Sequence, residues 1–282
     1  MPGRPSRRSP AARLRRHRAG MIGTMLLTIL AVLALTGPLL SPHGLDAVDW
    51  AAFERPPSAS HIFGTDSAGR DLFVRLMLAT GISLLLGLLA SLVSVVIGIL
   101  WGAIAGFAGG RVDAVMMRLV DILYAMPFMF LVILLMVVFG RSIWLIFIGV
   151  GAIEWLTLAR IVRGQTMQLK AMPFVEAARA CGASPARIVA RHIVPNLLGV
   201  VAIYATLTVP QVILVESFLS FLGLGVQEPL TSLGVLAKDG VDALETAPWL
   251  LLFPGGWLAL LLIALNLLGD GLRDALDPRE AL

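Results

Sequence analysis

Long apolar stretches, separated by shorter polar segments, make up most of the chain. Residues 21–40 form the first stretch, and its length is about what a helix needs to cross ~30 Å of hydrocarbon. Residues 76–108 are uncharged for 33 positions, which is too short for two crossings and a turn, so they predict one long or tilted helix. Four more spans are predicted, at residues 122–140, 143–159, 197–224 and 248–268. The pattern predicts an all-α polytopic membrane protein with six transmembrane helices.

Small residues recur at every fourth position along the second predicted span and indicate a close contact between helices. Small side chains on one helix face let two backbones approach each other in lipid. We expect this face to be a packing surface or, alternatively, a sliding contact in a moving transporter. Its residues are Ala90, Ser94, Gly98, Gly102, Gly106 and Gly110.

The polar segments between the spans differ in length and charge. Residues 41–75 and 226–248 are long loops, and the second is net acidic. Residues 111–118 are expected to be a short charged link between the second and third spans, and residues 141–142 a turn between the third and fourth. Pro127 is expected to kink or loosen the third span.

The polar segment 172–196, here called the elbow, carries the signals of two short helices that meet at a corner. Pro173 suits the first position of a helix, where its missing N–H would have no partner. Gly182 follows that helix as a C′ glycine, and Ser184 can cap the next one. We expect Pro195 to end the unit.

The composition agrees with a membrane protein. Hydrophobic residues make up 58% of the 282 residues and charged residues only 14%, whereas soluble domains contain about 25% charged residues. A cleaved signal peptide is an alternative explanation for the first apolar stretch, but residues 34–36 form a poor cleavage site.

The basic residues are distributed unevenly along the chain. Residues 1–20 contain seven arginines and no acidic residue, which is typical of a cytoplasmic tail before a first span. If the N-terminus is inside, 17 of the 22 lysines and arginines fall on the inner side and five on the outer side. This bias predicts that both termini and the elbow are cytoplasmic. It also explains the high pI without any nucleic-acid partner.

The sequence lacks the residue patterns of an ATP-binding loop, of an internal disulfide and of a metal site. A phosphate-binding Walker A loop needs a lysine directly after a glycine, and neither Lys170 nor Lys238 follows one. Cys181 is the sole cysteine, which excludes an internal disulfide. Histidines are scattered without the spacing of metal ligands, so we expect no metal site and no cofactor: His17, His43, His61 and His192.

Three polar residues lie within the predicted spans and are candidates for a translocation path. A carboxylate at membrane depth is costly and normally faces protein or a water-filled path. Glu216 and Glu154 are therefore candidates, and Gln211 lies in the same span as Glu216. The alternative is structural pairing, since Arg160 follows Glu154 by six positions.

The elbow resembles the EAA loop of bacterial ABC-importer permeases. The similarity rests on the run 176–178, on Gly182 and on the run 193–195. In that family the loop lies in the cytoplasm and seats its first helix in a groove of the ATP-hydrolysing subunit. The resemblance implies an ATPase-coupling role for six residues: Glu176, Ala177, Ala178, Arg179, Gly182 and Pro195.

Three further segments are similar to the C-type subunits of the dipeptide, oligopeptide and nickel branch of that family. They are residues 61–71, 216–225 and 266–278. In the first, family members usually continue with a serine where this chain has Val74. The resemblance covers nearly the whole chain, from about residue 20 to residue 279.

The resemblance implies a type I ABC-importer permease fold in the cytoplasmic (inner) membrane of a bacterium. We expect three parts: a basic tail at 1–20, a first helix with its external loop at 21–75, and a five-helix core at 76–282. The implied function is translocation of dipeptides or oligopeptides. The implied partners are a homologous second permease, two ABC ATPase subunits and an extracytoplasmic solute-binding protein.

Three alternatives remain open at this point. A permease for a nickel chelate or for glutathione belongs to the same class. A secondary transporter driven by an ion gradient would suit acidic residues within the spans, but it would have no use for a docking elbow. A membrane enzyme would need a paired nucleophile, metal ligands or an acid–base pair, and the sequence indicates none of these.

Overall fold

The computed structural model describes residues 13–14, 17–44, 47–139 and 143–276. In these ranges the chain is mostly helical and contains no β-strand beyond isolated bridges. The helices, with one π-helical segment η1, are α2 (Arg18–Leu40), α3 (Leu72–Ala108), α4 (Gly110–Ala125), α5 (Phe128–Phe139), α6 (Ile143–Lys170), α7 (Pro173–Ala180), α8 (Pro185–Ile188), η1 (Val189–Ile193), α9 (Val194–Phe221), α10 (Leu233–Asp242) and α11 (Trp249–Leu276).

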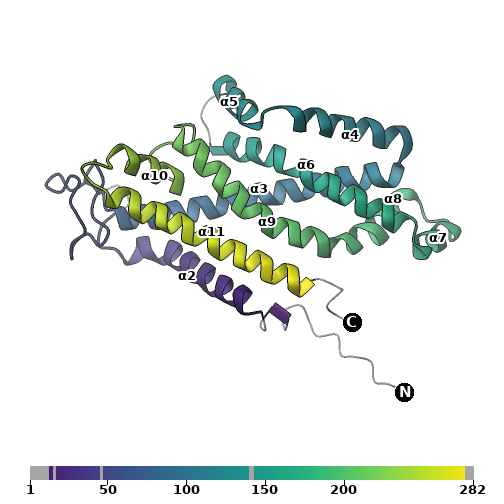
Figure 1. Ribbon diagram of the computed structural model, residues 1–282, viewed down its shortest axis with the longest axis horizontal. Coiled ribbons are helices and arrows are strands. Elements are labelled where there is room, and N and C mark those ends of the chain that lie inside the picture. The colour runs from purple at the N-terminus through teal and green to yellow at the C-terminus, as the bar shows by residue number, and fades with distance from the viewer. Residues whose placement is uncertain (1–12, 15–16, 45–46, 140–142, 277–282) are drawn as a thin grey trace, which may run out of the picture.

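The long helices lie roughly along one axis and form an elongated bundle (Figure 1). The short helix α10 and the loop between α2 and α3 lie at one end of the bundle, while α7 and α8 lie at the other (Figure 1). The start of α2 and the end of α11 are side by side, and His17 Nε2 is 2.9 Å from Asp274 Oδ2. Both of these helix ends point toward the end that contains α7 (Figure 1).

Four helical stretches among the described residues are long and apolar enough to cross a membrane. They are Arg18–Leu40, Leu72–Ala108, Pro185–Phe221 and Trp249–Leu276. These correspond to the first, second, fifth and sixth predicted spans, and they show a multi-pass membrane protein. The helix of the second span begins four residues earlier than the apolar pattern suggested, because Asp71 caps it by accepting a hydrogen bond from the Val74 N–H at 3.0 Å.

The face of small residues on α3 is a packing surface against α6. A Cβ atom added to Gly102 would lie 2.5 Å from the Ala159 carbonyl oxygen, and one added to Gly106 would lie 2.7 Å from the Arg163 carbonyl oxygen. The two backbones are thus too close for any larger side chain, which confirms the packing interpretation. Gly110, at the end of the series, has open space around its Cβ position.

The prediction of a charged link at residues 111–118 is wrong. These residues form the first part of α4, and the chain reverses at Gly109 and Gly110, whose φ angles are +69° and +54°. Arg111 and Arg118 are exposed, as a link would require, but they lie on the helix α4. Exposed charges alone therefore did not distinguish a loop from a surface helix. Pro127 does interrupt the helix, since Met126 before it is extended and α5 starts after it. The predicted turn at 141–142 lies outside the described residues.

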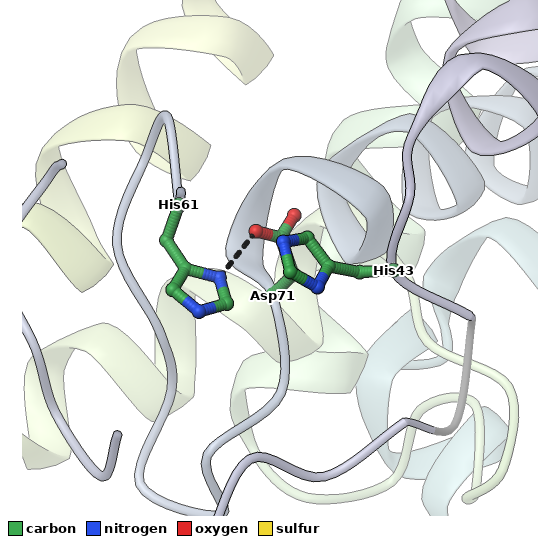
Figure 2. Close-up of side chains that lie close together, drawn as sticks. All are labelled: His43, His61 and Asp71. Atoms are coloured by element: carbon green, nitrogen blue, oxygen red, sulfur yellow. Dashed lines mark hydrogen bonds and ion pairs between the residues drawn. The ribbon is translucent and has the colours of Figure 1, made fainter. Parts of the chain in front are cut away.

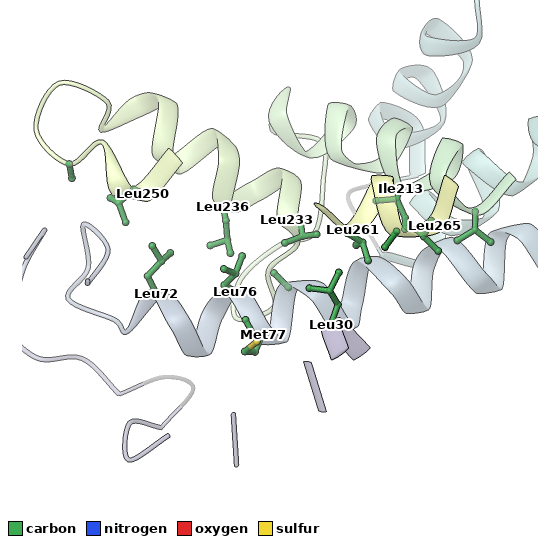
Figure 3. Close-up of a cluster of buried hydrophobic side chains, with 14 residues drawn as sticks. Leu30, Leu72, Leu76, Met77, Ile213, Leu233, Leu236, Leu250, Leu261 and Leu265 are labelled. Atoms are coloured by element: carbon green, nitrogen blue, oxygen red, sulfur yellow. The ribbon is translucent and has the colours of Figure 1, made fainter. Parts of the chain in front are cut away.

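A leucine-rich core fills the end of the bundle near α10 (Figure 3). Leu76 and Met77 of α3 are fully buried there, and Leu30 of α2 is 2% exposed. α10 contributes Leu233, and α11 contributes Leu261, and both are fully buried. This core fixes α10 and the neighbouring loops against the long helices.

Candidate functional site: the elbow and the polar clusters of the helix bundle

The elbow has the local structure that its sequence predicts. Pro173 occupies the first turn of α7, and Gly182 has a φ of +78°, as expected for a C′ glycine. Ser184 caps α8 by accepting a hydrogen bond from the Arg187 N–H at 3.4 Å. Two short helices therefore meet at a corner whose backbone conformation strongly favours glycine.

Pro195 does not end the unit, which corrects the prediction. It lies in the first turn of α9, and the helix runs on from α8 through η1 without a break. A proline is tolerated here because the helix widens just before it: the Val194 N–H bonds to the Val189 carbonyl, five residues back. The side-chain amide of Asn196 donates to the His192 carbonyl at 2.6 Å. The second arm of the elbow is therefore continuous with the fifth span.

Three buried apolar side chains hold the elbow against the helix bundle. Val175, Ile188 and Ile193 are at most 1% exposed. They pack in one cluster with residues of α3 and α6, including Ala103 and Val162. Val175 is the anchor on α7, whereas Ile188 and Ile193 anchor the second arm of the elbow, so both arms pack against α3 and α6.

The other face of α7 is polar and exposed. Glu176, Ala177 and Arg179 are exposed, while Ala178 is partly buried and packs on the apolar cluster. Within the described part of the chain, Glu176 has no ion-pair partner. Arg179 lies over the ring of Phe107 at 5.5 Å from its centroid. The predicted coupling residues of α7 thus present a charged surface beside the apolar anchors.

A bidentate ion pair connects α4 to α6 near the elbow. Arg163 Nε lies 2.5 Å from Asp113 Oδ1, and Arg163 Nη2 lies 2.6 Å from Asp113 Oδ2. Hydrogen bonds from Arg163 lower the pKa of the Asp113 carboxyl. Its neighbour Arg160 pairs with Asp121 at 2.9 Å. Arg160 therefore does not pair with Glu154, for which no partner is found among the described residues.

Glu216 lies at the opposite end of the bundle, in a cage of serines. It is 1% exposed. Its Oε1 accepts a hydrogen bond from Ser220 at 2.7 Å, and its Oε2 accepts one from Ser83 at 3.4 Å. Ser220 is also 3.1 Å from Ser232, which caps α10. The carboxylate thus joins α3, α9 and the start of α10, and the sequence pattern gave no sign of these partners.

The three predicted translocation residues differ in their exposure. Gln211 is exposed on α9, whereas Glu216, five positions later, is buried in the interior of the helix bundle. Glu154 is partly buried on α6. Gln211 and Glu154 are thus accessible at least in part, whereas Glu216 is enclosed by protein.

A network of charged residues links the loop before α3 to the loop before α10. Asp66 accepts hydrogen bonds from Arg70 Nε at 2.8 Å and from Arg75 Nη1 at 2.5 Å. Arg70 also pairs with Glu228 at 2.9 Å. Asp239 of α10 lies 3.8 Å from Arg75, and burial raises the pKa of this carboxyl against the opposing effect of the arginine. In the same loop, Gly64 and Gly69 have φ angles of +81° and +75°, which glycine adopts more readily than other residues.

Comparison with protein families gives two matches. Residues 98–281 match the family described as the binding-protein-dependent transport system inner membrane component. Residues 9–57 match the N-terminal transmembrane domain of oligopeptide transport permease C.

Individual relatives are similar over nearly the whole chain. An oligopeptide transport system permease protein of Escherichia coli strain K12 is 51% identical over 270 residues, which cover 95% of this chain and 89% of the relative. One from Haemophilus influenzae is 50% identical over 94% of this chain and 86% of the relative. A dipeptide transport system permease protein of Bacillus subtilis is 44% identical over 95% of this chain and 84% of the relative.

Proposed function

The chain belongs to the family of binding-protein-dependent transport system inner membrane components, and from this premise we propose that it is a permease subunit of an ATP-driven peptide importer. The relatives that support a peptide substrate are named for oligopeptide and dipeptide transport, and the match covers 84–89% of their lengths. A permease for nickel chelates or glutathione is the alternative within the same class.

We propose that the chain has six transmembrane helices and that both termini and the elbow lie in the cytoplasm. The membrane is proposed to be the inner membrane of a bacterium. Four of the spans are the long apolar helices described above. The remaining two are the predicted spans 122–140, which includes the end of α4 and all of α5, and 143–159, which is the first part of α6. The basic tail at 1–20, the unit 21–75 and the core 76–282 then keep the boundaries that the sequence predicts. Supporting this topology, the described ends of α2 and α11 point toward the elbow (Figure 1).

The elbow is proposed as the coupling element between an ATPase subunit and the spans. Its exposed face carries Glu176 and Arg179, and its buried face carries Val175. A partner that binds the exposed face can move α7, and the anchors transmit that motion to α3 and α6. The continuity of α8 with α9 provides a second connection, directly into the fifth span. In this proposal the spans have two arrangements, one open to each side of the membrane. The ATPase bound at the elbow and the solute bound at the spans each favour one of these arrangements, which gives alternating access.

The energy source is proposed to be ATP hydrolysed by partner subunits. Neither lysine of the chain follows a glycine, so the chain lacks the phosphate loop that hydrolysis requires. The assembly would contain this chain, a homologous second permease, two ABC ATPase subunits and an extracytoplasmic solute-binding protein. Peptide selectivity would be shared with that binding protein.

Glu216 is proposed to act mainly as a polar strut between helices, since serine hydroxyls surround both of its carboxylate oxygens. Gln211 and Glu154 are the better candidates for contact with a solute or with water, because each is accessible at least in part.

The single observation that carries this proposal is the elbow, whose exposed helix α7 carries charged side chains and whose buried anchors pack against two long helices, α3 and α6. Uptake of a labelled tetrapeptide into proteoliposomes tests it. The complete assembly with ATP inside should accumulate peptide, and an ionophore that collapses ion gradients should leave uptake unchanged.

The chain without its partners should neither hydrolyse ATP nor accumulate peptide. Peptide uptake by this chain alone, driven by a proton or sodium gradient, would support the secondary-transporter alternative and refute the proposal. Uptake of a nickel chelate or glutathione in place of peptides would leave the importer mechanism standing and overturn the substrate assignment.

A further inference from the structure

Two histidines and an aspartate that are distant in sequence meet beside the start of α3 (Figure 2). His43 comes shortly after α2, His61 lies in the following loop, and Asp71 immediately precedes α3. One nitrogen or oxygen atom from each of the three lies within 4.8 Å of the others. His61 and Asp71 are 6% and 5% exposed, and His43 is half-buried. We propose that these three residues bind a divalent transition-metal ion, for which Zn²⁺ is the appropriate probe.

The donor atoms select the class of ion. Two imidazole nitrogens and one carboxylate oxygen suit Zn²⁺, Ni²⁺ or Cu²⁺, whereas Mg²⁺ and Ca²⁺ prefer oxygen donors throughout. Three protein ligands leave the fourth position of a tetrahedral zinc site for water or another group. A cavity of about 420 Å³, lined in part by all three residues, provides room for that fourth ligand.

The pair formed by His61 and Asp71 is already close to the geometry of two ligands on one ion. His61 Nδ1 lies 2.9 Å from Asp71 Oδ2 (Figure 2). Nitrogen and oxygen ligands of a tetrahedral zinc stand about 3.4 Å apart, because each metal–ligand bond is about 2.0–2.2 Å long. Replacing the shared proton by Zn²⁺ therefore requires a separation of only about half an ångström. The other carboxylate oxygen, Oδ1, is occupied in capping α3, which fixes the orientation of Asp71.

The surroundings place a carboxylate near the second nitrogen of His61. A ligating histidine usually donates its second N–H to a carboxylate, which fixes the ring. His61 Nε2 lies 3.8 Å from Asp49 Oδ2, which is too long for a hydrogen bond, so Asp49 must move closer to provide this support. His43 stacks on His61 with ring centroids 4.4 Å apart and borders two cavities, so its ring has space to turn toward the ion.

A bound ion would connect three segments: the chain after α2, the loop around His61 and the first turn of α3. These segments are otherwise joined by hydrogen bonds such as that from His43 Nε2 to the Ser60 carbonyl at 2.8 Å. The ion would therefore stabilise this end of the bundle. This role does not depend on which solute the protein transports.

The test is a Zn²⁺ titration of the full chain in detergent, purified with a histidine-free affinity tag and freed of metal by a chelator. Competition with a chromophoric indicator should show one Zn²⁺ bound per chain. His43→Ala should weaken that binding by about 100-fold or abolish it, since even residues behind the ligands contribute 10- to 100-fold. His61→Gln, which keeps most of the buried volume, should have the same effect. His192→Ala is the matched control, because His192 is also half-buried but lies in the elbow.

Co²⁺ bound at the same site should give visible absorption bands that disappear in His43→Ala. Unchanged affinity in both His43→Ala and His61→Gln, with the proteins folded by circular dichroism, would overturn the proposal. So would a parent chain that binds no Zn²⁺ saturably. Equal losses in the His192→Ala control would identify adventitious surface binding and would also overturn it.

Discussion

At the end of the bundle that contains α10, a group of charged side chains is buried and paired, whereas in the elbow the charged side chains are exposed and, within the described ranges, form no ion pairs. Asp66 and Arg75 are 3% and 5% exposed and bond to each other. Glu176 and Arg179 of α7 are exposed to solvent. The same residue types therefore serve different purposes at the two ends.

Physical magnitudes explain the difference. Removing one partner of a buried ion pair costs about 3–5 kcal/mol, because the other charge is left without compensation. An exposed charge contributes about 0–1 kcal/mol to folding and remains available to a partner protein. We therefore expect mutations of the buried charges near α10 to reduce stability and mutations on the exposed face of the elbow to reduce coupling.

The largest expected effect is the loss of Asp66. Asp66→Ala leaves Arg75 buried without its closest acceptor and removes hydrogen bonds to the backbone N–H groups of Ala68 and Arg70. We expect destabilisation of about 3–5 kcal/mol and little assembled protein in the membrane. Membrane abundance and thermal unfolding in detergent measure this. Asp242→Ala, which removes an exposed ion pair with Lys238, is the control and should leave abundance normal. Equal abundance of the two variants would contradict the comparison.

The second prediction is that Gly182→Val reduces transport but leaves the assembly of the protein in the membrane intact. At a φ of +78°, valine incurs a strain of about 1–2 kcal/mol, even though a Cβ atom there would meet no neighbour. Because the strain falls at the corner of the elbow, Gly182→Val should displace α7 and strongly reduce peptide uptake. Gly164→Val is the matched control: its Cβ also has open space, but its backbone is helical.

Glu176→Lys should resemble Gly182→Val, because it places a positive charge in the first turn of α7 and reverses a charge on the exposed face. Both variants should remain in the membrane at near-normal levels and co-purify with less ATPase subunit, or hydrolyse ATP without responding to the loaded binding protein. Full uptake and normal stimulated hydrolysis in both would show that the elbow is not the coupling element.

The smallest effect is expected at Glu216. Glu216→Gln keeps the size and an oxygen acceptor for the serine hydroxyls, so stability and uptake should change little. Glu216→Leu should cost about 1–3 kcal/mol, because buried hydroxyls lose their acceptor. Thermal unfolding and uptake, measured together, separate two roles. A stable Glu216→Gln variant that no longer transports peptide would place this carboxylate on the translocation path.

Much of the local structure could be predicted from the sequence, because local features follow from residue type. Apolar length predicted the four long helices, and the small residues of α3 predicted its packing face. Pro173 and Gly182 gave the start and the corner of the elbow. These features depend on helix period, on caps and on backbone freedom, all of which act over a few residues.

Local signals failed where a proline or a charge is accommodated by its neighbours. Pro195 alone predicts the end of a helical unit, but the π-helical segment before it lets the helix continue. Arg111 and Arg118 suggested a link, but they belong to a helix. Whether a helix ends or continues at such positions depends on how the neighbouring backbone adjusts. The conformational preference of one residue type does not determine this.

Only the tertiary structure decided which distant polar residues meet. Ser83 and Glu216 are 133 positions apart and share a hydrogen bond, and His43 and His61 stack although their spacing has no metal-ligand pattern. The same holds for Asp66 and Glu228, which are joined through Arg70. Residue type determined that each of these groups needs a partner when buried. Which partner it finds depends on how the long helices pack, and that arrangement results from the sum of many apolar contacts rather than from any local motif.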